Sequence, residues 1–326
     1  MFTHKDIENR TIFVVDCINH ERRLKVNAGE FHLQEILADN KHKTLTKFPF
    51  QKLIALFVIG NISITTPLID KCKKYGIAII VVKPNLRPVF IWNNIAEANF
   101  LLRKRQYDFP ITDLSIAETI IKNKILNQKS ALLKTRKKDP LSTNAIKLCD
   151  SMIKEIDAID DYNRLMGIEG IVANTYFSAY FQDLDWKGRH PRTKTDYINS
   201  ILDIGYTILF NFVESFVRLF GFDVYIGVYH RLWFKRKSLI CDLIEPFRCI
   251  IDHIVLIAIN RKQFSEKDFL CSKNEWILKR EKSMDYYRVF FDAIIPYKTD
   301  IFKYIQKYYR CFMGNKSINE YPIFKF

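Results

Sequence analysis

The fold is decided by the stretch Leu53-Ile-Ala-Leu-Phe-Val-Ile59, which residues 63–76 connect to a second apolar run, Ile77-Ala-Ile-Ile-Val-Val82. Both runs have the length and the β-branched composition of buried strands. The segment between them predicts one helix, with Thr66 as the N-cap, Pro67 in the first position and a glycine at the end. The centre of the N-terminal region is therefore a strand–helix–strand unit.

Working outward from this unit, the apolar period changes near Asn94 from two to 3.6 residues. Before that point, further strands are predicted at Thr11–Cys17, 24–26, 31–33 and Pro88–Trp92. After it, helices are predicted at about 94–105, 113–138, 142–166, 168–181, 196–221, 238–260 and 277–312. The sequence thus predicts an α+β protein with two domains, a small β-rich, β-sandwich-like domain over residues 1–92 and a larger all-α domain over residues 93–326.

Composition narrows the class of protein. The 326 residues include 14% aromatic residues and only 10 glycines and 10 prolines, which excludes disordered and collagen-like chains. No uncharged apolar run approaches the roughly 18 residues of a membrane span, and the N-terminus does not resemble a signal peptide, so we expect a cytoplasmic protein. Seven scattered cysteines without a Cys-x-x-Cys pair predict free thiols and no zinc site.

The net charge of +15 makes a polyanion the expected partner. The cations gather in three groups. The first is residues 103–138, beginning with Arg103, Lys104 and Arg105. The second is Lys187, Arg189, Arg192 and Lys194, and the third is Arg231, Lys235, Arg236 and Lys237. Such groups favour contact with a nucleic-acid backbone. An anionic membrane surface and a merely solvated basic surface are the alternatives.

Two segments place a titratable group in unusual surroundings. Glu169 lies in Gly167-Ile-Glu169-Gly170, where a helical pattern is interrupted, and glycines allow a ligand to come close. A plain helix–helix turn with an exposed glutamate is the alternative. His230 follows an apolar run and opens a basic loop, where it is either a ligand or a hydrogen-bonded structural residue.

A third segment, Ser238-Leu-Ile-Cys-Asp242-Leu-Ile-Glu245-Pro246-Phe-Arg248, carries two acids on one helix face. Pro246 should kink the helix next to them. The acids form either a hard-cation site or a salt-bridged surface in which Arg248 pairs with Glu245. Carboxylates with an imidazole suit Mg²⁺ or Mn²⁺, and such a site in a basic protein indicates metal-assisted phosphodiester chemistry. Phosphate-loop and dinucleotide-binding motifs are absent from the sequence.

At these residues the sequence resembles the CRISPR-associated integrase family of spacer acquisition, the Cas-one family. Four stretches carry the resemblance, in the order and at the spacing of that family. They are residues 56–82; Met166-Gly-Ile-Glu169-Gly170 with Tyr176-Phe177; Arg189-His-Pro-Arg192 with Asp196, Asn199 and Leu202; and His230 with Ser238-Leu239 and Asp242-Leu-Ile-Glu245-Pro-Phe-Arg248. Together they span about residues 56 to 250, and a relation to the type V branch is suspected.

The resemblance implies a function and a site. Glu169, His230 and Glu245 would be the metal ligands for Mg²⁺ or Mn²⁺, and Asp242 a further acid of the catalytic site. The chain would be a metal-dependent DNA endonuclease and integrase that joins 3′-hydroxyl ends of short foreign DNA to the CRISPR repeat array. It would form a homodimer, through its N-terminal domain, and a larger complex with the small ferredoxin-like Cas-two partner.

The chain departs from the family pattern at three positions, since Lys235 replaces a usual glycine and Arg192 and Cys249 replace frequent prolines. None of the three is a proposed ligand. A stand-alone structure-selective nuclease of DNA repair and a non-catalytic DNA-binding scaffold are the alternative functions. The DNA contacts expected from sequence are Arg103, Lys104, Arg105, Arg189, Arg192, Arg231, Lys235, Arg236, Lys237 and Arg248.

Overall fold

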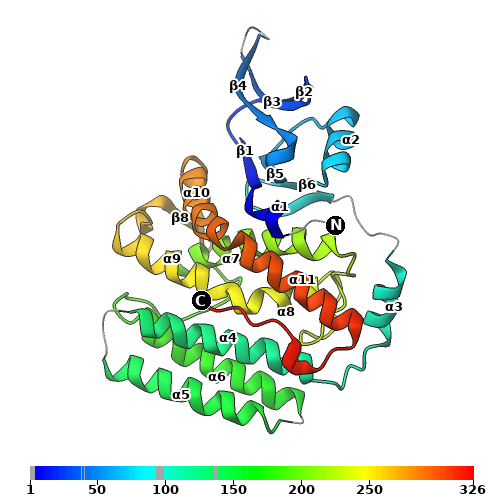
Figure 1. Cartoon of the computed structure of the whole chain (residues 1–326). Helices are drawn as coiled ribbons and strands as arrows, with labels where there is room; N and C mark the ends of the chain where they lie inside the picture. The colour runs from blue at the N-terminus through cyan, green and yellow to red at the C-terminus, as the bar shows by residue number, and fades with distance from the viewer. Residues whose placement is uncertain (1–3, 38, 40, 93–98, 136–138, 160) are drawn as a thin grey trace.

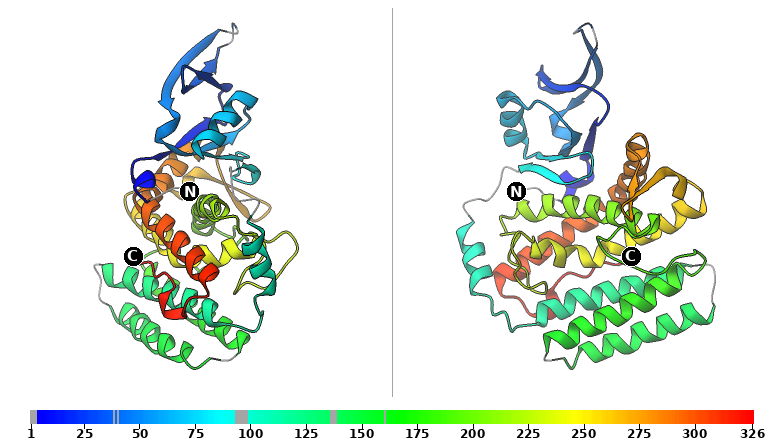
Figure 2. Two further views of the ribbon diagram at one scale, coloured as in Figure 1. Left: turned by 45° about the vertical axis from the view of Figure 1, so that its right-hand side comes forward. Right: turned by 180° about the vertical axis from the view of Figure 1, so that it is seen from behind.

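The computed structural model describes residues 4–37, 39, 41–92, 99–135, 139–159 and 161–326. The strands of the N-terminal region lie at one end of the molecule, and a layer of three helices, α4, α5 and α6, lies at the other (Figure 1). The remaining long helices lie between these two layers, as the views in Figure 2 confirm. The predicted α+β class, with a β-rich N-terminal part and a larger helical part, is confirmed.

The predicted strand–helix–strand unit is present as β5 (Leu53–Gly60), α2 (Thr66–Tyr75) and β6 (Ala78–Val82). The N-cap of helix α2 is Thr65, one residue earlier than the predicted N-cap, Thr66. Every residue of β5 and β6 is buried, because the sheet is covered on both faces. Along β5 the side chains alternate, so that Phe57 faces the helical part and Leu56 faces the core of the N-terminal part.

Two sheets make up the N-terminal part. A four-stranded sheet has the order β1-β5-β6-β7, with β1 and β6 parallel to β5 and β7 antiparallel to β6. A three-stranded antiparallel sheet has the order β2-β3-β4. The other strands of these two sheets are β1 (Thr11–Cys17), β2 (Arg22–Asn27), β3 (Glu30–Ile36), β4 (His42–Pro49) and β7 (Pro88–Trp92). The sequence did not reveal β4, because most of its side chains are exposed and show no apolar alternation.

The rest of the described chain is mainly helical. Its helices are α1 (His4–Glu8), α3 (Phe100–Asp108), α4 (Ser115–Lys134), α5 (Pro140–Ile156), α6 (Tyr162–Tyr180), α7 (Tyr197–Leu219), α8 (Ser238–Ile244), α9 (Arg248–Asn260), α10 (Ser283–Ile294) and α11 (Lys298–Gly314). Single 3₁₀ turns lie at η1 (Phe50–Lys52), η2 (Glu245–Phe247), η3 (Glu266–Asp268), η4 (Arg280–Lys282), η5 (Ile295–Tyr297) and η6 (Ile318–Glu320). A hairpin of β8 (Phe269–Ser272) and β9 (Glu275–Leu278) is added to the helices.

Three predicted helices differ clearly from those observed. The helix expected over residues 142–166 ends at Ile156, and the one expected over residues 168–181 begins earlier, at Tyr162. The helix expected over residues 277–312 is divided, because Trp276–Leu278 belongs to the hairpin and Pro296 separates α10 from α11. Helix α6 is continuous through Gly167 and Gly170, where a helix end was expected. A side chain at either glycine would meet open space, so both lie on an uncrowded face and cost helix stability without ending the helix.

The β-rich and helical parts pack closely against each other. Phe57 of β5 and Phe291 of α10 lie edge to face with centroids 5.0 Å apart, and the hydroxyl of Tyr287 donates to the carbonyl of Pro84 at 2.7 Å. The predicted domain boundary falls at residues 93–98, which lie outside the described residues, so it stays a prediction.

One described helix, α7, is long and apolar enough to cross a membrane, but 78% of its most apolar window is buried in the interior. Helix α7 is therefore a core helix, in agreement with the sequence, which predicts no membrane span. The cysteines are all free thiols, as expected, and all but Cys271 are buried.

A buried acid joins three core helices. Asp252 of α9 is 1% exposed and accepts hydrogen bonds from the hydroxyls of Tyr176 in α6, at 3.1 Å, and Tyr206 in α7. Burial raises the pKa of this carboxyl to about 6, although the two hydroxyls oppose the rise.

Replacement of Asp252 by asparagine tests this pKa. Because the folded-state pKa exceeds the unfolded value of about 4, the contribution of Asp252 to stability is complete at about pH 3, declines as the pH rises through 4 to 6, and is fully lost only at about pH 7. The unfolding free energy of the wild type should fall by about 3 kcal/mol relative to Asp252→Asn over that interval, as measured by urea unfolding at each pH. Parallel pH profiles for the two proteins would contradict the assignment.

Candidate active site

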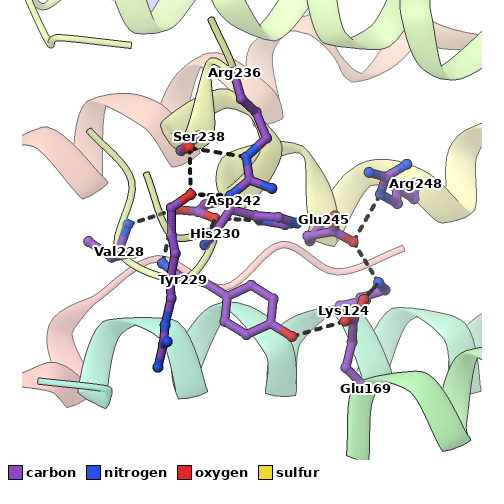
Figure 3. A network of polar contacts seen from close by, with 11 residues as sticks. Lys124, Glu169, Val228, Tyr229, His230, Arg236, Ser238, Asp242, Glu245 and Arg248 are labelled. Carbon is purple, nitrogen blue, oxygen red and sulfur yellow. Dashed lines mark hydrogen bonds and ion pairs between the residues drawn. The ribbon is translucent and has the colours of Figure 1, made fainter. Parts of the chain in front are cut away.

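Two glutamates from different helices meet around one lysine (Figure 3). Glu169 comes from the middle of α6 and Glu245 from the start of η2. The ammonium of Lys124, on α4, forms ion pairs with both carboxylates, and its Nζ lies 2.6 Å from Glu245 Oε2. The predicted acids are therefore brought together, and the cation between them is a residue that the sequence did not single out.

Pro246 explains the position of Glu245. The α-helical pattern of α8 ends at Ile244, and Pro246 lies in the first turn of η2, so the helix is interrupted next to the acids, where a kink was predicted. The side-chain amide of Asn127, on α4, donates to the carbonyl of Pro246 at 2.9 Å. This bond fixes η2 against α4 and thereby sets Glu245 opposite Lys124.

The cations keep both glutamates ionised despite their burial. Burial would raise the pKa of Glu245, but Arg248 and Lys124 outweigh it, and the pKa lies below its usual range. Burial would likewise raise the pKa of Glu169, and Lys124 reverses this, with help from the hydroxyl of Tyr229, which donates at 2.9 Å. For Lys124, burial lowers the pKa but the two glutamates outweigh it and raise it.

Asp242 has a different role from Glu245, although it lies three residues before it. The carboxylate of Asp242 is fully buried and accepts four hydrogen bonds from the loop that precedes α8. The donors are the backbone amides of Val228, Tyr229 and His230, at 2.7, 3.1 and 2.8 Å, and the imidazole Nδ1 of His230, at 2.7 Å. Asp242 therefore shapes the loop and orients the imidazole.

The orientation of His230 follows from the chemistry of its partner. A carboxylate oxygen accepts the hydrogen bond here, so Nδ1 of His230 carries a proton and Nε2 is the ring nitrogen left for another partner. This arrangement, a histidine held by a carboxylate, is typical of histidines that bind metals. The ring lies between Asp242 and Glu245 in Figure 3. Gly227 permits the loop to approach Asp242, because a Cβ there would lie 2.5 Å from Oδ2.

The donor set fits a hard cation, with one rearrangement. Within the described residues, no three His, Cys, Asp or Glu side chains are grouped closely enough to hold a metal as they stand. Lys124, however, already places one positive charge between Glu169 and Glu245, where carboxylate oxygens would bind Mg²⁺ or Mn²⁺. A divalent ion there would require the ammonium to move aside.

The predicted DNA contacts fall into two groups. Some hold the fold together, since Arg103 and Arg105 donate to backbone carbonyls, Arg189 pairs with Asp203, Lys237 pairs with Glu214 and Arg248 pairs with Glu245. Four others are exposed, and these are Lys104, Arg192, Arg231 and Lys235. Arg236 is half-buried and donates to the carbonyl of Arg231. Of the predicted DNA contacts, only Arg248 belongs to the group formed with Lys124, Glu169 and Glu245, called here the glutamate cluster.

Sequence analysis missed Lys124, Asn127 and Tyr229 as parts of the site. A signal was available for α4, where Asn123, Lys124, Asn127 and Gln128 are all buried on an otherwise apolar face. Buried polar groups require partners, so such a row indicates a polar site facing that helix. Tyr229 gives no comparable signal, because a tyrosine beside apolar residues is usual in a core.

The sequence matches one protein family. The model of the family described as CRISPR associated protein Cas1 matches residues 17–290. A curated relative, the CRISPR-associated endonuclease Cas1 1 of Thermodesulfovibrio yellowstonii, is 30% identical over 271 residues, which are 80% of this chain and 83% of the relative. This chain belongs to the Cas1 family. It is thus a CRISPR-associated protein of a class whose curated relatives include endonucleases.

Solved structures show the same fold. A casposase bound to an integration product superimposes with a TM-score of 0.74 at 18% identity, covering 97% of this chain and 96% of the casposase. A chain of a partial Cas6-RT-Cas1–Cas2 complex superimposes with a TM-score of 0.72 at 19% identity, covering 97% and 99%. At these identities the likeness establishes the fold.

Replacement of Asp242 by alanine tests its structural role. Four donors, one of them buried and three partly buried, would lose their acceptor, so we expect the unfolding free energy to fall by about 3 kcal/mol or more. Asp157→Ala is the matched control, because its carboxylate is mostly exposed and pairs with Lys122 at the surface, where the loss should stay below about 1 kcal/mol. Urea unfolding measures both. Similar losses for the two variants would show that Asp242 does not hold the loop.

Proposed function

We propose that this chain is the integrase of CRISPR adaptation, a metal-dependent DNA endonuclease and transesterase. It would join the 3′-hydroxyl ends of short foreign DNA to the repeat array without ATP. The observation that carries the proposal is the pair of ionised glutamates, half-buried Glu169 and buried Glu245, that share one cation in a chain of this family. A basic protein with such a pair is equipped to hold a phosphodiester against a cation.

Each residue of the cluster has a task in this proposal. Glu169, Glu245 and Nε2 of His230 would hold Mg²⁺ or Mn²⁺. A bound ion would polarise the phosphate, stabilise its developing charge and lower the pKa of the attacking hydroxyl or water. Asp242 orients His230, and Arg248 keeps Glu245 ionised. Lys124 would leave the glutamates when the ion binds, and its ammonium would then be free to pair with a phosphate oxygen.

The proposed partners follow from the relatives. The matched structures include Cas1–Cas2 complexes and a casposase bound to its integration product. We therefore propose that this chain binds DNA and a small Cas2-type partner, and that it forms a homodimer through residues 1–92. A cytoplasmic location and the type V affiliation stay predictions.

An integration assay tests the function. With Mn²⁺ or Mg²⁺, the wild type should join labelled DNA carrying free 3′-hydroxyls to a plasmid that bears a repeat. Glu169→Ala and Glu245→Ala should each lower joining about 100-fold or more while DNA binding, measured by anisotropy, survives. Glu155→Ala removes a glutamate that pairs with Arg164 away from the cluster, and serves as control.

The outcomes of this assay separate the alternatives. Unimpaired joining by either glutamate variant would contradict the assignment of the site. Cleavage of branched DNA without joining would favour a stand-alone nuclease. Binding without any product, at every concentration of Mn²⁺, would favour a non-catalytic scaffold.

Replacement of Lys124 by methionine tests the shared position of lysine and metal. Without its ammonium, the buried Glu245 and the half-buried Glu169 lose a counter-ion, so we expect the unfolding free energy to fall by about 3 kcal/mol or more. Because a divalent ion would then have no competitor, Mn²⁺ should raise the melting temperature of Lys124→Met more than that of the wild type. Calorimetry with and without Mn²⁺ measures both effects.

The control for this prediction is Lys122→Met on the same helix, which removes a surface ion pair with Asp157. Its response to Mn²⁺ should equal that of the wild type. An equal response in Lys124→Met would mean that the ion binds elsewhere.

A further inference from the structure

Residues 321–326, called here the strap, lie against the back of the turn that carries Glu245. They follow η6 and run between α4 on one side and η2 and α9 on the other (Figure 1). Phe324 is 5% exposed, whereas its neighbours Ile323 and Lys325 are exposed. The strap forms neither a helix nor a strand, so its buried backbone groups need partners elsewhere.

Two asparagines of α4 supply those partners. The side-chain amide of Asn123 donates to the carbonyl of Phe324 at 2.7 Å and accepts from the N–H of the same residue at 2.8 Å. The side-chain oxygen of Asn127 accepts from the N–H of Phe326 at 3.0 Å, and its nitrogen donates to the carbonyl of Pro246. Both asparagines are buried, so these bonds are shielded from water. Asn127 therefore joins the strap to η2.

A ring contact holds the strap to the same turn. Phe324 and Phe247 of η2 pack edge to face, with ring centroids 4.8 Å apart, and Phe247 is fully buried. Removal of the Phe324 ring would leave a cavity beside η2. The strap thus contacts Phe247 directly and Pro246 through Asn127, and these are the two residues that follow Glu245.

We propose that the strap positions Glu245 for the divalent ion, and that ion binding in turn tightens the strap. Lys124 and Arg248 contact the carboxylate of Glu245 itself, whereas the strap supports the backbone that carries this side chain. Because Lys124 would have to leave when an ion binds, support that does not depend on Lys124 keeps the carboxylate in place. Groups behind a metal ligand change metal affinity by roughly ten- to a hundredfold.

The two effects are linked. A strap that raises the affinity for the ion must itself be held more firmly, by the same factor, when the ion is bound. The inference rests on the proposed function in taking Glu245 as a ligand of that ion. It goes further by giving a task to residues 321–326 and to Asn123, which neither the sequence motif nor the metal chemistry includes.

Calorimetric titration of the full chain with Mn²⁺ tests the first effect. Phe324→Ala should bind Mn²⁺ about tenfold or more weakly than the wild type. Joining of DNA by this variant should need correspondingly more Mn²⁺ but should approach the wild-type rate at saturating Mn²⁺, because the variant keeps every proposed ligand. Phe50→Ala is the matched control, since it also removes a fully buried ring, but from the separate core of the N-terminal part, and its Mn²⁺ affinity should be unchanged.

Hydrogen exchange measured by mass spectrometry tests the second effect. The amides of residues 321–326 in the wild type should exchange more slowly with Mn²⁺ than without it, and Glu245→Gln should abolish the difference. Asn123→Leu, which nearly keeps the size of the side chain but cannot bond to Phe324, should speed this exchange and weaken Mn²⁺ binding together.

A double-mutant cycle tests the positioning without any metal. Phe324→Ala and Glu245→Gln should each lower the melting temperature of the full chain. The double variant should lose clearly less than the sum of the two shifts, because each change already weakens what the other depends on. Phe50→Ala combined with Glu245→Gln should give additive shifts, because Phe50 belongs to a separate core.

The outcomes decide between the strap and a general effect of stability. Additive shifts in the first cycle, or unchanged Mn²⁺ affinity in both Phe324→Ala and Asn123→Leu, would overturn the inference. Equal losses of affinity in Phe324→Ala and Phe50→Ala would overturn it as well. If the cycle shows coupling but the wild type neither binds Mn²⁺ nor joins DNA, the proposed function fails and the strap remains the support of Glu245. Joining by the wild type with additive shifts has the opposite meaning.

Discussion

The site depends on one interaction, the pairing of the Lys124 ammonium with the carboxylates of Glu169 and Glu245. Two ionised carboxylates, one buried and one half-buried, repel each other and lose hydration, so a cation between them is needed to keep them together. That requirement ties α4, α6 and η2 to one point. The need for positive charge between Glu169 and Glu245 also makes this position suitable for a divalent ion. The site favours whichever cation binds the carboxylate oxygens best.

The two acids of the segment before Pro246 show how a small change of backbone separates roles. Asp242 lies inside α8 and turns toward the loop, where four N–H groups occupy its oxygens. Glu245 lies at the start of η2 and turns toward α4. Spacing alone placed both on one helix face, and the resemblance left Asp242 as a further acid of the site. Its hydrogen bonds indicate that it acts through His230.

Sequence reasoning succeeded where local chemistry dominates. The apolar runs of β1, β5, β6 and β7 and the break at Pro246 all follow from period, length or ring geometry. It failed where tertiary contacts decide. Gly167 and Gly170 do not end α6, because packing elsewhere along the helix outweighs their cost, and the β8–β9 hairpin depends on a turn at Lys273 and Asn274, both of which adopt positive φ. The role of Lys124 could not be seen, because its partners lie 45 and 121 residues away.

The basic charge is the clearest case of a sequence property that the fold redistributes. Residues 103–138 hold the largest surplus of cations, yet Lys122 and Lys129 pair with acids of α5, Lys134 lies over the ring of Phe326, and Arg105 binds the end of α11. Cations paired in this way stabilise helix packing, and they are less available to bind a polyanion. Arg192, Arg231 and Lys235 are fewer but exposed, and they lie around the loop that holds His230. The density of charge along a sequence therefore overstates some surfaces and understates others, and here the cations left exposed to meet a phosphate backbone include those of the loop after His230.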